Sequence, residues 1–117
     1  MKHIQVRIRD IVYFDLGETR GHETNKTRPC LVTAIPSEAP HGKGPAGMVV
    51  VLPLTSSQHN FWTEVRVRKK GKMKNDSFVL CHQIRALDSS RAERRIAEIG
   101  SREMKRVKQV LRIMLGI

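Results

Sequence analysis

Three shortages in this 117-residue sequence exclude classes of protein. Aromatic residues make up 4% of the chain, too few for an extended base-stacking platform, although Phe61 and Trp62 are candidates for stacking on one or two bases or for the edge of the core. The apolar stretch from Met48 to Leu54 contains a proline and is much shorter than the roughly 20 residues that span a bilayer. No signal peptide is apparent. We therefore expect a cytoplasmic protein that does not enter a membrane.

Cysteine is also scarce. Cys30 and Cys81 are too few and too isolated for a disulfide framework or a zinc site. Both lie in apolar runs, where cysteine behaves as a small hydrophobic residue. The glycine patterns of phosphate-binding and dinucleotide-binding loops are absent. We predict two buried, unreactive thiols, no metal site and no cofactor.

Acidic residues are few relative to basic ones. The chain has 22 Lys and Arg against 11 Asp and Glu, which gives a net charge of +11. A run of charge is often only a solvated face, but here few acidic groups are available to neutralise the basic ones. The surplus therefore favours a polyanionic partner such as a nucleic acid. Two basic clusters stand out, at residues 66–74 and 91–108.

The hydrophobic pattern predicts a mainly β protein. The stretch 48–52 is apolar throughout, which indicates a strand covered on both faces. From Ser101 the apolar positions recur with helical spacing up to a stop at Gly116. One domain over residues 1–117, a strongly bent sheet or barrel with a C-terminal helix, fits these elements. The predicted strands are 11–16, 30–35, 48–52, 63–68, 77–81 and 95–99, with loops at 17–27 and 36–47.

Polar residues stand just beyond the ends of three predicted strands. Polar groups held at the ends of rigid strands are a common way to build a site. Ordinary turn chemistry accounts equally well for the hydroxyl residues, because serine and threonine favour turns without any further role. The residues are Arg28 before the second strand, Thr55, Ser56 and Ser57 after the third, and His82, Gln83 and Arg85 after the fifth.

Three blocks in this order resemble the PemK/MazF family of toxins from bacterial toxin–antitoxin pairs. They are IVYFDLG, GHE and RPCLV within 11–32, VVLPLTS at 50–56, and SFVLCHQIRALD at 77–88. The resemblance implies an SH3-like barrel with a C-terminal helix, a homodimer, and sequence-specific, metal-independent cleavage of single-stranded RNA. It also implies a cognate antitoxin whose acidic tail blocks the RNA groove, and the charge of +11 suits both anionic partners.

The resemblance also gives roles to single residues. Arg28 matches the catalytic arginine of the family, and its permanent charge suits stabilisation of the transition state better than proton abstraction. Thr55 matches the catalytic threonine, with Ser56 beside it, and both hydroxyls can donate to phosphate oxygens. Glu23 matches an acidic loop residue that shapes the RNA site in some members, and His22 in the same loop is a candidate base contact.

One position departs from the family pattern. Many members have aspartate where this chain has His82, and some have arginine at the position of Leu80. An imidazole exchanges protons near neutral pH more readily than a carboxylate does. We therefore hypothesise that His82 transfers a proton; a purely local hydrogen bond, or weakened catalysis, are the alternatives. The further candidates for RNA binding are Gln83, Arg85, Arg66 and Arg68.

Two other functions are open to this sequence. Toxins of the CcdB type share the fold but inhibit gyrase without catalysis, and a basic RNA-binding module with degraded activity is a third possibility. The pairs Arg28-Pro29 and Thr55-Ser56 favour the ribonuclease, because inhibition of gyrase requires no phosphate-directed pair. Sequence patterns do not disclose the RNA motif, the identity of the antitoxin or the role of the loop at 36–47.

Overall fold

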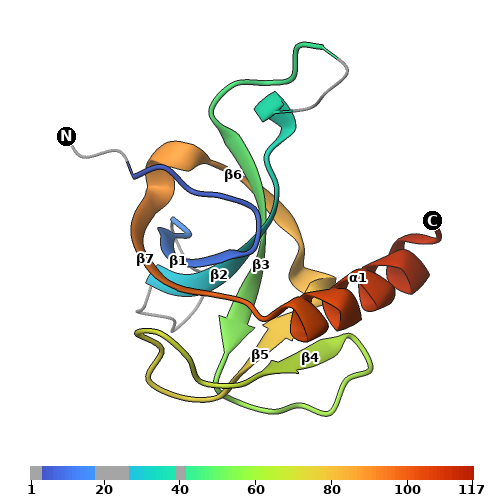
Figure 1. Ribbon diagram of the computed structural model, residues 1–117. Coiled ribbons are helices and arrows are strands. Elements are labelled where there is room, and N and C mark those ends of the chain that lie inside the picture. The colour runs from blue at the N-terminus through green and yellow to red at the C-terminus, as the bar shows by residue number, and fades with distance from the viewer. Residues whose placement is uncertain (1–3, 18–26, 39–41) are drawn as a thin grey trace.

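The computed structural model describes residues 4–17, 27–38 and 42–117 (Figure 1). This part of the chain forms seven strands, three short 3-10 turns and one helix. The strands are β1 (Asp10–Asp15), β2 (Thr27–Ala34), β3 (Met48–Thr55), β4 (Glu64–Val67), β5 (Ser77–Leu80), β6 (Arg85–Asp88) and β7 (Ala92–Glu98); the turns are η1 (Pro36–Glu38), η2 (Cys81–Gln83) and η3 (Ser89–Arg91); the helix is α1 (Ser101–Leu115).

All strand pairs in the sheet are antiparallel. The order is β4-β5-β3-β2-β1-β7. β6 pairs with the first half of β3, and β5 pairs with the end of β3. The sheet bends strongly without closing, since its two end strands, β4 and β7, do not pair. The predicted class, mainly β with a C-terminal helix, is confirmed, and the barrel is an open one. The turn after β4 spans part of the gap, because the Lys72 N–H donates to the Ile96 carbonyl at 2.7 Å.

Gly71 makes this closing contact possible. Its φ is +56°, and a Cβ atom at this position would lie 2.5 Å from the Ile96 carbonyl oxygen. Both the left-handed backbone and the close approach to β7 require a residue without a side chain. The β4–β5 hairpin is thereby held against β7, next to the cleft described below.

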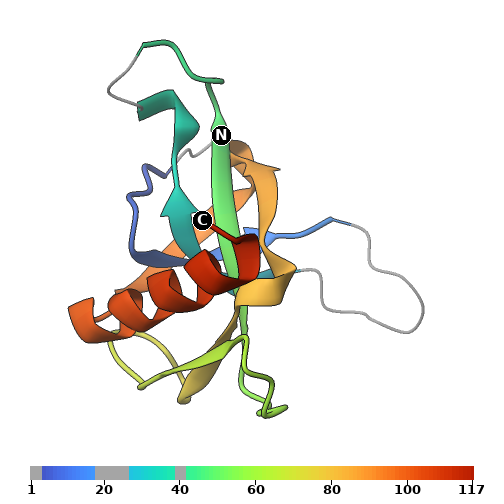
Figure 2. The same ribbon diagram turned by 90° about the vertical axis from the view of Figure 1, so that its right-hand side faces the viewer.

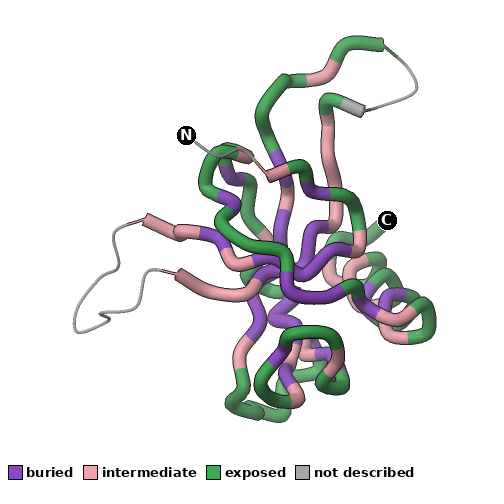
Figure 3. Tube along the Cα trace, turned by 60° about the vertical axis from the view of Figure 1, so that its left-hand side comes forward, coloured by how far each residue is buried: buried purple, intermediate pink, exposed green. Residues whose placement is uncertain are grey.

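Both faces of the central strands are buried. Val49 and Val51 of β3 pack in one apolar cluster with Phe14, while Leu52 and Leu54 pack in a second cluster. This arrangement confirms the predicted burial on both faces for most of 48–52, although Met48 is exposed and Val50 is partly buried, and it explains why that stretch lacks polar alternation. Figure 3 shows the buried segments gathered at the centre of the molecule.

Several strand boundaries differ from the predictions, and one strand was missed. β2 begins at Thr27, before the predicted start at Cys30, so Arg28 lies within the strand and not before it. β3 continues through Pro53, because the proline stands where β3 changes its partner from β6 to β5 and a missing N–H is tolerated there. β6 was not predicted, since only Leu87 of its four residues is buried and the segment shows no alternation. β7 begins at Ala92, before the predicted start at Arg95.

Helix α1 packs against β4 and η2 with one face (Figure 2). Met104 and Val107 are buried in the larger apolar cluster, as their spacing predicts, whereas Leu115 is half exposed. The N-cap is Gly100, one residue before the predicted Ser101. Gly116 ends the helix with a φ of +70°, as expected. No helix in the described segments is long and apolar enough to cross a bilayer.

Both thiols are buried, as predicted. Burial raises the pKa of the Cys30 thiol to about 12 and the pKa of the Cys81 thiol to about 11. At neutral pH neither forms the reactive thiolate to any useful extent. In Figure 1 the described parts of the 36–47 loop project from the end of the molecule opposite the β4–β5 hairpin.

Candidate active site

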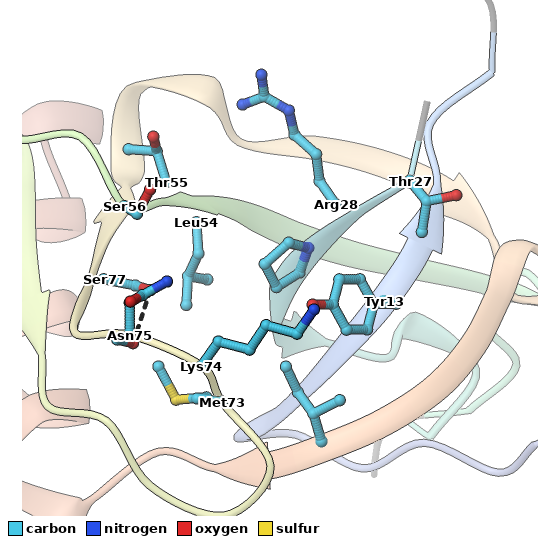
Figure 4. Close-up of a pocket in the computed structure, with 12 residues that line it drawn as sticks. Tyr13, Thr27, Arg28, Leu54, Thr55, Ser56, Met73, Lys74, Asn75 and Ser77 are labelled. Carbon is cyan, nitrogen blue, oxygen red and sulfur yellow. Dashed lines mark hydrogen bonds between the residues drawn. The ribbon is translucent and has the colours of Figure 1, made fainter. Parts of the chain in front are cut away.

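A cleft lies between the β4–β5 hairpin and the start of β2 (Figure 4). It has a volume of about 270 Å³, and its walls come from five strands, β1, β2, β3, β5 and β7, and from the hairpin turn. Figure 4 shows Thr55 and Ser56 on one side of the cleft, Arg28 on another, and Lys74 extending across it toward Tyr13. The lining residues are Tyr13, Thr27, Arg28, Pro29, Leu54, Thr55, Ser56, Met73, Lys74, Asn75, Ser77 and Ile96.

A second cavity, of about 420 Å³, adjoins the first. Arg28 and Thr55 line both cavities and therefore stand at their junction. A chain-like ligand that occupies both cavities has to pass these two side chains. The remaining residues of the second cavity are Ser57, His59, Leu80 and Gln83.

Strand pairing brings Arg28 and Thr55 to this junction. Arg28 lies near the start of β2, opposite Phe14 of β1, and Thr55 ends β3 opposite Phe78 of β5. The β2–β3 ladder ends at the pair Cys30–Pro53, so both side chains project just past its last rung. They are thus held by regular strands but left accessible at the strand ends.

The Thr55 hydroxyl is oriented by the backbone. Its oxygen accepts the Ser57 N–H at 3.1 Å, in a turn typical of threonine. The hydroxyl proton remains available for a ligand oxygen. Of the described residues that line the two cavities, none is acidic and two, Arg28 and Lys74, are permanently or normally cationic. The junction is therefore suited to an anionic group such as a phosphate.

The structure places His82 beside this site rather than in it. Its Nδ1 lies 2.7 Å from the Thr63 hydroxyl oxygen, and the Phe61 ring meets it edge-on at 5.6 Å. His82 is not among the described residues that line either cavity. The proton-transfer role of His82 stays a prediction, and these contacts support the alternative of a local hydrogen bond.

The other predicted RNA-binding residues are divided by the fold. Ser56 lines the first cavity and Gln83 the second. Arg85 is exposed on β6, opposite Val51, and lines neither. His22 and Glu23 lie outside the described residues.

Arg66 and Arg68 lie at the other side of the hairpin, toward α1. The Arg66 guanidinium forms an ion pair with Asp76 at 2.8 Å, and the Arg68 N–H donates to Glu103 at 2.8 Å. Neither arginine lines the two cavities. Trp62 is exposed and lines a shallow groove with Arg66 against α1, so it belongs to neither the core nor the cleft.

Four residues of the site were not singled out by the sequence patterns: Tyr13, His59, Lys74 and Asn75. In the sequence, Tyr13 has the pattern of an ordinary strand residue, and Lys74 is one member of a basic run. His59 lies in a polar segment outside the three family-like blocks. No local signal marks them, because the fold brings them together from separate parts of the chain: Tyr13 from β1, His59 from the segment between β3 and β4, and Lys74 and Asn75 from the β4–β5 turn.

The described residues contain no group of three His, Cys, Asp or Glu side chains placed to hold a metal ion. The groups that the two cavities do offer among the described residues are a guanidinium, an ammonium, hydroxyls, two amides and one imidazole. Such a set can bind a phosphodiester and can take a proton from, or give one to, a hydroxyl beside it.

Known proteins share the sequence pattern and the fold of this chain. The family model of the PemK-like, MazF-like toxin of type II toxin–antitoxin systems matches residues 7–115. The chain belongs to this toxin family. A curated relative, the endoribonuclease MazF of Staphylococcus saprophyticus, is 28% identical over 109 residues, which are 92% of this chain and 89% of the relative.

Solved structures of MazF toxins share the fold. The Mycobacterium tuberculosis toxin MazF-mt6 superimposes with a TM-score of 0.74 at 20% identity, covering 93% of this chain and 98% of that one. A crystal structure of MazE–MazF from Deinococcus radiodurans gives a TM-score of 0.72 at 26% identity and covers 94% and 95% of the two chains. The PemK/MazF resemblance is confirmed, and the gyrase inhibitor and the inactive RNA-binding module are not favoured.

Proposed function

We propose that this PemK/MazF toxin is an endoribonuclease that cleaves single-stranded RNA at the junction of the two cavities. The observation that carries the proposal is the presence of Arg28 and Thr55 in both cavities. Membership of a toxin family with a relative named endoribonuclease supports it. In this proposal residues 1–117 form a single toxin domain.

The chemistry follows from the groups at the junction. The 2′-hydroxyl of the RNA loses its proton and attacks the adjacent phosphorus, the bond to the 5′-oxygen breaks, and the products are a 2′,3′-cyclic phosphate and a 5′-hydroxyl. Negative charge gathers on the phosphate oxygens in the transition state. The Arg28 guanidinium, a planar fork of donors with permanent charge, stabilises that charge. The Thr55 hydroxyl donates a second hydrogen bond and orients the phosphate. A fixed cation of this kind supplies the charge without a metal ion.

The two cavities hold the nucleotides on either side of the scissile bond. In the first cavity Lys74 neutralises a neighbouring phosphate, and Asn75 and Tyr13 offer hydrogen bonds and a ring to a base. In the second, Gln83 offers an amide to the next base. Bases reach such groups only when they are unstacked, so the substrate is single-stranded. Discrimination among these bases is the source of sequence specificity.

The same positive groove suits an acidic antitoxin. The MazE–MazF structure of the Deinococcus relative shows that a related toxin assembles with an antitoxin. We propose that an acidic antitoxin segment competes with RNA for this groove and that the toxin acts as a homodimer in the cytoplasm, where its RNA is. Complementary charge speeds and selects such an association.

Cleavage of a long single-stranded RNA tests the proposal. The purified protein is incubated with the RNA in the presence of a chelator, as wild type, as R28A and as R102A, a matched change of an exposed arginine on α1. We expect discrete fragments with cyclic-phosphate and 5′-hydroxyl ends, and a rate lowered by about 10²- to 10³-fold in R28A only. Intact RNA with folded wild-type protein, or equal rates for R28A and R102A, would overturn it.

A further inference from the structure

The cleavage reaction needs a group that takes the 2′-hydroxyl proton, and Arg28 and Thr55 are poorly suited to this. A guanidinium stays protonated at neutral pH, and a threonine hydroxyl is too weak a base. Of the described residues that line the two cavities, none is acidic and one, His59 in the second cavity, carries an imidazole. An imidazole is the side chain whose ordinary pKa is nearest neutrality. The segment around His59 is therefore the described part of the site that can accept this proton.

Glu64 holds this imidazole in one orientation. The His59 Nδ1 lies 2.8 Å from a Glu64 carboxylate oxygen, and the His59 backbone N–H reaches both oxygens at 3.1 and 3.2 Å. The Asn60 N–H donates to the same carboxylate at 3.1 Å. The carboxylate thus binds the backbone and the ring of one residue together, which restricts the torsions of the His59 side chain.

The Glu64 side chain is only 4% exposed, whereas the His59 side chain is 47% exposed. Burial alone would raise the pKa of Glu64, but the hydrogen bonds from His59 and Asn60 outweigh it and hold that pKa below its usual value. A Glu64 carboxylate at this distance favours a proton on Nδ1 of His59. In the tautomer with that proton, Nε2 carries the lone pair that a general base requires.

A stack of rings supports the plane of the imidazole. The His59 and Phe61 rings are nearly parallel, at 8° and a centroid distance of 5.6 Å. Phe61 in turn rests on His82, whose Nδ1 is bonded to Thr63. His82 thereby contributes to the position of His59 through Phe61 rather than through contact with the groove.

We propose that His59 is the general base of RNA cleavage and that Glu64 is its positioning residue. The proposal rests on the proposed function. The His59 Nε2 takes the proton of the 2′-hydroxyl while that oxygen forms its bond to phosphorus. The electron pair of the broken phosphorus–oxygen bond passes to the 5′-oxygen, which takes a proton from water. The imidazolium is stabilised by Glu64 and returns its proton to the solvent after release of the product.

This assignment predicts a rate that rises with pH through the pKa of an imidazole. Among the described residues, the ionisable groups around His59 are Glu64 from β4, Arg28 from β2 across the second cavity, and His82 from η2 beyond Phe61. Single-turnover rates over about pH 5 to 9 resolve the rising limb. Binding is measured separately with an RNA that carries a 2′-deoxy group at the cleavage position and is not cut.

The variants are H59N, H59A, E64Q and H82N, with E98Q as the matched control for a carboxylate on the exposed part of β7. We expect H59N to lose about 10²- to 10³-fold in the rate at neutral pH and to lose the rising limb, with RNA affinity unchanged. Added imidazole restores part of the rate of H59A. In E64Q we expect the rising limb of the pH–rate profile to persist but to shift to lower pH, because the imidazolium has lost the carboxylate that stabilises it. E98Q should match the wild type.

Failure of this inference is distinguishable from failure of the proposed function. If wild type cleaves RNA and R28A does not, while H59N keeps the rate and the pH profile, His59 is not the base and the ribonuclease stands. A limb that disappears in H82N but persists in H59N assigns the proton to His82 and overturns the proposal. A rate that falls with pH in wild type makes the imidazole a general acid and also overturns it. Circular dichroism confirms that each variant is folded.

Discussion

Arg28 and Thr55 occupy facing positions on neighbouring strands. The β2–β3 ladder pairs Cys30 with Pro53, and Arg28 and Thr55 each lie two residues further toward the end of their strand. Because side chains alternate between the faces of a strand, Arg28 shares a face with Cys30, and Thr55 shares one with Pro53. A slip of one residue would turn Thr55 to the opposite face. The junction of the two cavities is thus a consequence of register.

The Thr55 hydroxyl is testable with two variants of similar size. T55V removes the donor to the phosphate and the acceptor of the Ser57 N–H, while T55S keeps both. We expect T55V to lose about 10- to 100-fold in kcat, since one transition-state hydrogen bond is removed, and T55S to remain near the wild type. Rates at saturating RNA check this, and equal losses in the two variants would contradict a role for the hydroxyl.

Lys74 and Arg66 belong to one basic run but differ in position. Lys74 lines the first cavity, whereas Arg66 is paired with Asp76 outside it. In K74Q we expect the slope of log affinity against log salt to flatten by about 0.7, the value for one phosphate contact on a single strand. R66Q is the matched change and leaves the slope unaltered. Fluorescence titrations of uncleavable RNA at several salt concentrations measure it; a flattened slope in R66Q instead would place the RNA on the α1 side.

Replacement of Gly71 by alanine, which adds only a methyl group, is predicted to destabilise the fold. G71A places a methyl group against the Ile96 carbonyl in a backbone with φ of +56°. We expect a loss of about 1–3 kcal/mol in the free energy of unfolding, from strain and from displacement of the Lys72–Ile96 hydrogen bond. Urea denaturation measures it, with K69A as an exposed control in the same turn. Equal stability of G71A and wild type would show that the hairpin is free to move away from β7.

Glu103 links the hairpin to the helix in a pH-dependent way. Burial would raise its pKa, but the Lys70 ammonium and the Arg68 and Gly100 N–H groups outweigh burial and lower it. A lowered pKa in the folded state stabilises the fold above the ordinary pKa of a glutamate, and this contribution is lost as the pH falls through the lowered value. E103Q should therefore melt at a lower temperature than the wild type at neutral pH.

The difference in melting temperature should shrink below about pH 4, where the carboxyl of the unfolded chain is protonated and the folded one begins to be. Melting curves of both proteins at several pH values check this. A gap that is constant with pH would assign the effect to packing rather than to charge. R102Q is a suitable control in the same helical turn, since its side chain is exposed.

The sequence by itself determined the strands with clear periodicity, the helix from 101 to 115, the burial of both cysteines and the family. These properties depend on neighbouring residues: alternation and helical spacing report how one element is buried. The three segments that resemble the PemK/MazF family also identified Arg28 and Thr55 as candidate catalytic residues. β6 was missed because it buries one residue. The prediction for β3 ended before Pro53 because the sequence does not show that the strand changes partner there, where a missing N–H is tolerated.

Only the tertiary structure decided which polar groups meet. The register of β2 against β3 brings Arg28 beside Thr55, and the folded hairpin carries Lys74 and Asn75 to the same cleft. The fold also hydrogen-bonds the His82 ring to Thr63, outside the two cavities, and places His59, which lies in a segment without a local pattern, in the second cavity. The physical reason is that strand register and hairpin docking arise from contacts between residues far apart in the chain, and no local periodicity encodes them.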